Sequence, residues 1–400
     1  MKIRKFLYAA TASALAGLML VGCAAPSASA GSSSAQQPSA AQPSSQAQPI
    51  TPVKDIEIGL VAPMTGNSGS MGVSQKQGYE LAMDEINGAG GVNGAKIVLS
   101  TYDDQGDPQR AASGAQKFAD NDAILAIGGS CNSSATLAMV PIVDNAGLPE
   151  LVVSSSSPQL TGSSEYFFRM SVQDAAVGPQ MAKALLSRGY KNVAVFYVNN
   201  DYGIGLSDSF KGYLEANGGT TLGSLTYLAT DQDFTAQITT AKGMNPDAVA
   251  LCGTMADSGL IIRQLKQNGV DVPVIGGTGL YNAKTIEIAG DSSEGVFVIG
   301  VYVANNPDPK VQELVAKYKK KYGVEPDGFA ALAYDQMYVI AEAAERALAS
   351  GELSRETFKE ALKTTNYKGV TGTVSFNEDN DWVRDYLTLT IKDKSFVMAE

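Results

Sequence analysis

Short apolar runs of strand length alternate with segments of helix length along most of the 400 residues. The clearest run, Asn192 to Val198 (NVAVFYV), is continuously apolar after its first residue, which is typical of a strand buried on both faces. Strict alternation of strands and helices indicates parallel sheets with right-handed crossovers. The pattern runs once through the first part of the chain and starts again near Phe167. It therefore predicts an α/β protein with two similar lobes, each a doubly wound, Rossmann-like parallel sheet.

Two polar loops lie in the stretch from Ala123 to Thr161. The predicted strand Ile124–Ile127 runs into Gly-Gly-Ser-Cys-Asn-Ser-Ser, and the predicted strand Leu151–Val153 runs into four serines. Loops that leave the carboxyl ends of parallel strands share one edge of the sheet, where open α/β folds bind ligands. Simple solvation would also explain serine-rich loops, but two adjacent loops of hydroxyl and N–H groups favour a site for one small polar molecule.

The composition argues against several classes of function. The chain has no histidine, which excludes Ser-His-Asp and Cys-His catalysis and any metal site that uses histidine. It also has no G-x-S-x-G motif, so a secreted serine hydrolase would need a Ser-Lys arrangement. A net charge of −11 disfavours a nucleic-acid partner. We therefore expect no enzymatic activity, no cofactor, no metal and no nucleic acid.

The first 54 residues read as an export and tethering region. Three cations precede the apolar run Phe6–Leu18, and Leu20-Val-Gly-Cys23 follows it. This order predicts a signal peptide over residues 1–22. The Leu-Val-Gly-Cys sequence resembles the bacterial lipobox, which implies that Cys23 is lipidated and anchors the protein outside the cytoplasm; a plain signal peptide with a chance cysteine is the alternative. Residues 23–54, rich in Ala, Ser, Pro and Gln, predict a disordered tether.

Two further cysteines, Cys131 and Cys252, follow this region. A disulfide between them is possible by count. However, Cys252 ends a strand-like run in the predicted second lobe, so we expect two buried free thiols.

Seven motifs, in the same order along the chain, resemble the leucine/isoleucine/valine-binding proteins. These are the lipoprotein or periplasmic substrate-binding subunits of branched-chain amino acid ABC transporters, with a type I periplasmic-binding-protein fold. The motifs are IGLVAPMTG, YDDQGDPQRA, GGSCNSSATLA, SSSSPQLT, NNDYGIGL, GGTGLYN and AYDQMYVIAEA. The resemblance implies a monomeric partner of an ABC permease. It also implies three crossover segments between the lobes, a ligand cleft between them, a first lobe of residues 55–172 plus 305–383, and a second lobe of residues 173–304 plus 384–400.

The resemblance also implies which residues bind an amino acid or similar solute. Asn132 and Ser133 would hold the carboxylate, in accord with the affinity of helix N-termini for anions. The loop containing Ser154 and Ser156 would accept hydrogen bonds from the ammonium, and Tyr202 of the second lobe would close over the ligand.

Three expected ligand-binding positions depart from the family pattern. Thr278 occupies a position where family members commonly have an acidic residue that contacts the ligand's ammonium. Thr254 and Met71 occupy two other positions that are often aromatic in the family. Recognition of an ammonium must then rely on hydroxyls, carbonyls or another acid such as Asp257, because an ammonium without a counter-charge is costly to bury. The function expected is capture of a branched-chain amino acid or related solute for an ABC importer. A ligand-sensing subunit of a membrane receptor with the same fold is the alternative.

Overall fold

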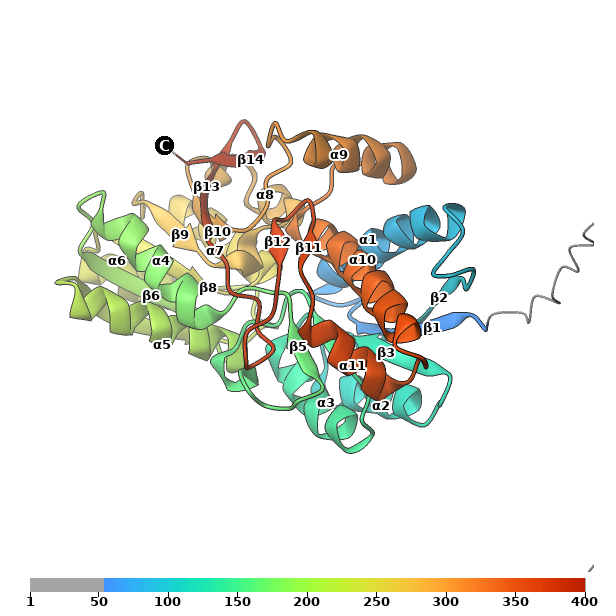
Figure 1. Cartoon of the computed structure of the whole chain (residues 1–400). Helices are drawn as coiled ribbons and strands as arrows, with labels where there is room; N and C mark the ends of the chain where they lie inside the picture. Colours follow the sequence, from blue (N-terminus) through green and yellow to red (C-terminus); the bar gives the residue numbers. More distant parts are fainter. Residues whose placement is uncertain (1–53, 400) are drawn as a thin grey trace, which may run out of the picture. The chain divides into compact units, whose positions relative to one another are not determined.

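The computed structural model describes residues 54–399, so that the predicted signal peptide, Cys23 and all of the tether but Lys54 lie outside the described residues. A five-stranded sheet forms the centre of the first lobe (Figure 1). All of its strands are parallel, in the order β2-β1-β3-β4-β5. They are β1 (Ile56–Ala62), β2 (Ile97–Asp103), β3 (Ile124–Gly128), β4 (Glu150–Val152) and β5 (Phe167–Arg169).

A seven-stranded sheet forms the centre of the second lobe, in the order β14-β13-β10-β9-β8-β6-β7. The strands from β6 to β10 are parallel, whereas β13 and β14 run antiparallel at one edge. They are β6 (Asn192–Val198), β7 (Thr220–Tyr227), β8 (Ala248–Cys252), β9 (Val274–Gly276), β10 (Phe297–Gly300), β13 (Leu387–Lys392) and β14 (Ser395–Met398). A separate two-stranded ladder joins β11 (Tyr367–Lys368) to β12 (Thr373–Val374).

Helices cover both faces of each sheet, as the alternating pattern predicts. In β1, Ile58 and Leu60 enter the same core as Tyr79 of the first helix, whereas Val61 enters a second core with Phe118. The first-lobe helices are α1 (Gly69–Gly88), α2 (Pro108–Ala119), α3 (Ser133–Asn145), α9 (Pro309–Tyr322), α10 (Gly328–Ala349) and α11 (Arg355–Lys363). Those of the second lobe are α4 (Asp174–Leu186), α5 (Asp201–Ala216), α6 (Thr235–Met244), α7 (Met255–Gln267) and α8 (Ala283–Ala289). Helices far apart in sequence lie side by side, as α1 and α10 do in Figure 1.

The chain crosses between the lobes three times: after β5, after β10 and before β13. Two arginines tie these crossovers together. The guanidinium of Arg169, which is fully buried, donates from Nε and Nη2 to the two carboxylate oxygens of Asp381, each at 2.7 Å. Arg384 Nη2 donates to the carbonyl oxygen of Val301 at 3.0 Å. The crossovers therefore form one connected hinge region, and the predicted two-lobe α/β fold with three crossovers is confirmed.

Several element boundaries differ from the residue-pattern predictions. The residue spacing predicts a helix from about Val73 to Ile86, whereas α1 begins four residues earlier, at Gly69, so that Met71 lies in its first turn. β5 pairs with β4 in the first sheet instead of opening the second set of strands, because Phe167–Arg169 lies beside Glu150–Val152. The sequence also predicts a strand over Thr371–Phe376, of which the structure forms only Thr373–Val374. None of the helices among residues 54–399 combines the length and the apolar character that a membrane span requires.

Candidate functional site

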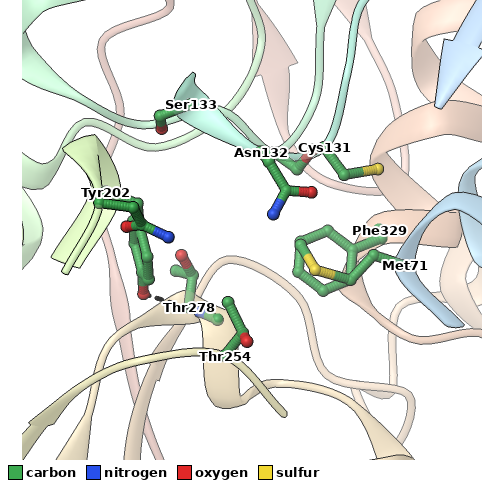
Figure 2. Close-up of a pocket in the computed structure, with 11 residues that line it drawn as sticks. Met71, Cys131, Asn132, Ser133, Tyr202, Thr254, Thr278 and Phe329 are labelled. Carbon is green, nitrogen blue, oxygen red and sulfur yellow. Dashed lines mark hydrogen bonds between the residues drawn. The ribbon is translucent and has the colours of Figure 1, made fainter. Parts of the chain in front are cut away.

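A pocket lies between the two lobes, at the carboxyl ends of the parallel strands (Figure 2). Its empty space, including the opening, is about 380 Å³. Both lobes contribute to its lining, and none of the lining side chains carries a formal charge. The first lobe contributes Met71, Cys131, Asn132, Ser133, Ser154 and Phe329, and the second lobe contributes Asn200, Tyr202, Thr254, Thr278 and Gly279.

The pocket brings together seven of the eight residues expected from the sequence to bind ligand. They are Met71, Asn132, Ser133, Ser154, Tyr202, Thr254 and Thr278. Ser156 is the exception: it is fully buried and does not line the pocket. Its backbone N–H instead donates to the hydroxyl oxygen of Ser133 at 3.2 Å. The structure therefore places Ser156 behind the pocket wall, where it supports Ser133.

The N-terminus of α3 borders the pocket. Ser133 is the first residue of this helix, and its Oγ accepts hydrogen bonds from the backbone N–H groups of Ser156 and Ser157, both at 3.2 Å. With two donors already on the oxygen, the hydroxyl proton is left to donate to a ligand. Unpaired N–H groups and the helix dipole add positive potential at the same place. The site is therefore suited to an acceptor such as a carboxylate.

Asn132, which precedes α3, presents both halves of its amide near the pocket (Figure 2). Its Nδ2 donates to Ser68 Oγ at 3.1 Å. Its buried Oδ1 has no hydrogen-bond partner among the described residues. The hydroxyl of Ser154, at the end of the neighbouring strand β4, likewise has none. A buried polar atom without a hydrogen-bond partner costs free energy. A ligand that donates a hydrogen bond to either of these two oxygens would remove that cost.

The thiol of Cys131 also borders the pocket. It donates to Gln75 Oε1 at 3.2 Å, and burial raises the pKa of the thiol well above its usual value. Cys131 and Cys252 are both buried and neither forms a disulfide, which confirms the expectation of two free thiols. A neutral, hydrogen-bonded Cys131 acts here as a small apolar wall residue.

Hydrogen bonds within the second lobe position the residues that this lobe contributes to the pocket lining. The phenolic oxygen of Tyr202 accepts a hydrogen bond from the backbone N–H of Gly279 at 3.2 Å (Figure 2). Thr254 caps α7, and its Oγ1 donates to Asp257 Oδ1 at 2.7 Å. Tyr227 donates to the second oxygen of Asp257. These bonds fix Tyr202 and Thr254 before any ligand arrives.

Asp257 does not supply the missing carboxylate to the pocket. It is buried, it does not line the pocket, and its oxygens already accept from Thr254 and Tyr227. Its pKa is nonetheless raised, because burial outweighs these hydrogen bonds. The capping role in α7 accounts for its position, so the sequence-based suggestion that Asp257 meets an ammonium is not supported.

Four lining residues are not among those that the sequence predicts to bind ligand: Cys131, Asn200, Gly279 and Phe329. Phe329, the second residue of α10, forms an apolar wall beside Met71 (Figure 2). No local pattern indicated it, because it reaches the site from a helix nearly 200 residues after the first loop. Asn200 caps α5 by accepting from the N–H of Gly203 at 2.9 Å. The position of Asn200, two residues before the expected ligand contact Tyr202, is the sequence signal that could have identified it as a lining residue.

Hydrogen bonds join the lobes on both sides of the pocket. On one side Ser134 Oγ donates to Asp201 Oδ2 at 2.6 Å, and Gln159 Nε2 donates to Asp201 Oδ1 at 3.1 Å. On another side Asn282 Nδ2 donates to Asp327 Oδ2 at 2.7 Å. The described conformation is therefore one in which the lobes are in contact around the pocket.

Comparison with known proteins places the chain in a family. Residues 55–395 match the model of the periplasmic binding protein family. The leucine-, isoleucine-, valine-, threonine- and alanine-binding protein of Pseudomonas aeruginosa is 33% identical over 330 residues, which cover 82% of this chain and 87% of that protein.

Two solved structures share the fold. A leucine binding protein from Thermotoga maritima is 30% identical, with a TM-score of 0.81 over 86% of this chain and 98% of that one. The branched-chain amino acid transporter substrate-binding protein from Streptococcus pneumoniae, in complex with isoleucine, is 29% identical, with a TM-score of 0.80 over 86% and 97% of the two chains. The chain therefore belongs to the periplasmic binding protein family, whose members are extracytoplasmic solute-binding proteins and not enzymes.

Proposed function

We propose that this protein captures a branched-chain amino acid or a related small polar solute between its lobes and delivers it to an ABC permease. The observation that carries the proposal is the uncharged pocket between the two sheets, with the N-terminus of α3 at one wall and Tyr202 at another. The named ligands of the relatives from Pseudomonas aeruginosa and Streptococcus pneumoniae support the same class of solute.

In the proposed orientation the solute's carboxylate lies at Asn132 and Ser133. The hydroxyl proton of Ser133 and the N–H groups of the first turn of α3 donate to it. Its ammonium lies near Ser154 and Thr278, whose hydroxyl oxygens accept from it. Because no lining side chain is charged, the ammonium is held by neutral acceptors only. The proposed ligand contacts are Met71, Asn132, Ser133, Ser154, Tyr202, Thr254 and Thr278, with Ser156 acting through Ser133.

Closure of the lobes would trap the solute. We assign residues 55–172 and 305–383 to the first lobe and residues 173–304 and 384–400 to the second. The hydrogen bonds from Ser134 and Gln159 to Asp201 require the lobes to be together, so they favour the closed form. A permease could then distinguish loaded from empty protein by the relative position of the two lobes.

The proposal extends to location and assembly. Residues 1–22 would be removed as a signal peptide, and fatty acylation of Cys23 would anchor the protein to the bacterial membrane. Residues 24–54 would tether a monomeric binding unit to that anchor. Metabolic labelling with a fatty acid tests the anchor: label should enter the wild-type protein and not the Cys23→Ala variant.

A thermal-shift panel of amino acids and small carboxylates tests the ligand class. A solute that binds only the folded protein increases the free energy of unfolding, by about 2.7 kcal/mol when its concentration is 100 times its Kd. The melting temperature rises as a result. We expect aliphatic amino acids to raise the melting temperature. No shift with any amino acid, in a protein that unfolds cooperatively, would contradict the amino acid assignment.

Two serine variants test the placement of the solute. Ser154→Ala should weaken binding by about 1–3 kcal/mol if Ser154 contacts the solute directly. Ser156→Ala is the matched comparison, since it changes the same group on a residue behind the wall, and it should weaken binding less. An unchanged affinity of the Ser154→Ala variant would mean that the solute lies elsewhere.

A further inference from the structure

Two adjacent residues of the second lobe meet two adjacent residues of the first lobe beside the pocket. Asn282 Nδ2 donates to Asp327 Oδ2 at 2.7 Å, and the ring of Tyr281 lies against the backbone of Gly328. We call these four residues the clasp. Phe329, which lines the pocket, is the next residue after the clasp in the first lobe. The clasp therefore joins the lobes within one residue of the pocket lining.

The polar half of the clasp joins two helix N-termini. Asn282 caps α8 by accepting from the backbone N–H of Lys284 at 2.9 Å, and Asp327 caps α10 by accepting from that of Ala330 at 2.9 Å. The carboxylate of Asp327 also accepts from Ser74 Oγ of α1 at 2.8 Å. Both partners of the bond between the lobes are thus held by their own lobes. An increase in the separation of the lobes would therefore lengthen this bond.

The apolar half of the clasp leaves no room for a side chain at Gly328. A Cβ atom at this position would lie 2.7 and 2.8 Å from Cδ1 and Cε1 of Tyr281. These are the only atoms within 4 Å of that position among the described residues, apart from its chain neighbours and its own helix. Non-bonded carbon atoms pack at about 3.5–4.0 Å, so an alanine would need roughly 1 Å of additional separation.

The backbone at Gly328 does not itself require glycine. Gly328 is not among the glycines with a positive φ, so its conformation is open to other residues. The proximity of the Tyr281 ring is therefore the reason that a residue without a side chain fits at the start of α10.

The ring of Tyr281 is held by contacts within the second lobe. It packs edge-to-face on Phe396 of β14, with ring centroids 4.6 Å apart and an interplanar angle of 81°. It also lies beside Gly300 of β10, and only 5% of Tyr281 is exposed. A ring packed in this way cannot turn aside without losing these contacts. The surface that Gly328 meets is therefore rigid.

We propose that Gly328 and Tyr281 are positioning residues that set how closely the lobes approach each other around a bound solute. This inference rests on the proposed function, since it concerns how tightly the closed lobes hold a solute. Neither residue is among the proposed solute contacts. The lack of a side chain at Gly328 lets the lobes come near enough for Asn282 to donate to Asp327. A side chain there would hold the lobes apart and weaken binding, although it touches no solute.

Calorimetric titration of the full-length protein with L-leucine tests the proposal. Gly328→Ala should weaken binding at least tenfold. Tyr281→Val removes both ring atoms that the added methyl group would meet, so Gly328→Ala should weaken binding less than threefold when it is added to the Tyr281→Val variant. Gly212→Ala is the matched control and should leave the affinity unchanged. This glycine lies within α5, has no positive φ and has open space where a Cβ atom would lie.

Two results would overturn the proposal. One is an affinity of the Gly328→Ala variant within threefold of the wild type. The other is an equal loss from Gly328→Ala with and without Tyr281→Val, which would show that alanine damages the end of α10 and not the contact between the lobes. If Gly328→Ala does not fold, Tyr281→Trp enlarges the same contact from the second lobe and should also weaken leucine binding; an unchanged affinity would again overturn the proposal.

A measurement without solute separates failure of this proposal from failure of the proposed function. Spin labels at Gln109→Cys in α2 and Ala236→Cys in α6, both exposed, report the separation of the lobes by pulsed electron spin resonance. A Cys23→Ala background leaves only the two buried native thiols. Gly328→Ala should lengthen the distance between the labels. If the wild-type protein does not bind leucine, the amino acid assignment is contradicted, and an equal distance with and without Gly328→Ala would overturn the positioning role as well.

Discussion

Ser134 Oγ donates a 2.6 Å hydrogen bond to Asp201 Oδ2, and this bond links the first turn of α3 in one lobe to the first turn of α5 in the other. Each partner is next in sequence to a pocket residue, Ser133 or Tyr202. The groups proposed to face the solute and the groups that join the lobes are thus carried by the same two helix ends. Under the proposed function we therefore expect solute binding and lobe closure to be coupled.

Loss of this link should weaken solute binding without removing any contact to the solute. Asp201→Ala deletes the acceptor for both Ser134 and Gln159, so we expect affinity to fall by about 1–2 kcal/mol, with the effect mainly in faster dissociation. Stopped-flow kinetics of binding measure this. Asp208→Ala is the control, because Asp208 lies on the same helix, is exposed and pairs only with Lys211 among the described residues. Equal rates for the Asp201→Ala variant and the wild type would show that the link does not stabilise the closed form.

Arg169 should be the most sensitive single residue for stability. Its guanidinium pairs with Asp381 inside the hinge region, and it also donates to the carbonyl oxygen of Ser157 at 2.9 Å. Arg169→Met leaves the buried carboxylate of Asp381 without its counter-charge, with only the hydroxyl of Thr161 among the described residues still donating to it, which should lower the free energy of unfolding by about 3–5 kcal/mol. Chemical denaturation measures the change. The double variant Arg169→Met, Asp381→Leu removes both charges and should recover part of the loss; a double variant no more stable than the single one would contradict this reason.

Glu150 should make the stability of the protein depend on pH. Burial raises the pKa of Glu150 to about 8, and neither carboxylate oxygen has a partner among the described residues. A carboxyl whose pKa is higher in the folded state favours folding at low pH and loses that advantage as the pH rises from the unfolded value near 4.5 to about 8.

Replacement of Glu150 by glutamine should remove this pH dependence. The Glu150→Gln variant should therefore gain stability relative to the wild type between pH 5 and pH 8, by on the order of 3 kcal/mol. Denaturation at the two pH values measures the gain. The exposed Glu345→Gln is the control and should gain nothing; a pH-independent difference for Glu150→Gln would rule out ionisation of Glu150 as the cause.

Thr278 should set how strongly the protein distinguishes an amino acid from its deaminated analogue. With no charged group in the pocket wall, the wild-type protein should bind a 2-hydroxy acid within about tenfold of the matching amino acid. Thr278→Glu places a carboxylate at the pocket and should shift that ratio at least tenfold toward the amino acid. A tenfold shift corresponds to roughly 1.4 kcal/mol, which a charge-assisted hydrogen bond to the ammonium can supply. Thr278→Gln has the same shape without the charge. The same shift in both variants would refute an electrostatic origin.

The fold could be predicted because the signals for its strands and loops lie in short stretches of sequence. Buried strands such as Asn192–Val198, and the loops that follow strands, can be recognised from a few neighbouring residues. Parallel pairing of the strands then places these loops together. Most lining residues expected from the sequence come from such loops. The grouping of β5 was misread from its pattern alone, because three residues do not indicate which sheet they join.

The remaining features depend on contacts between distant segments. Phe329 reaches the pocket from α10, and the pairing of Arg169 with Asp381 spans 212 residues, so neither has a local signature. Ser156 is two residues after Ser154 in a run of four serines, and alternation along an extended chain would place both on the same side. The chain instead bends at Val153 and Ser154, just after β4, and only Ser154 lines the pocket. The sequence does not indicate that the Asp257 carboxylate is occupied, because its partners Thr254 and Tyr227 are identified only by the folded structure.

A crystal structure of the protein with the best solute from the thermal-shift panel tests the proposed orientation most directly. We predict a carboxylate oxygen within about 3.2 Å of Ser133 Oγ and of an N–H group in the first turn of α3, with the apolar end of the solute toward Phe329. A solute bound outside the pocket, or one whose carboxylate faces Thr278 while its apolar end faces Ser133, would contradict it.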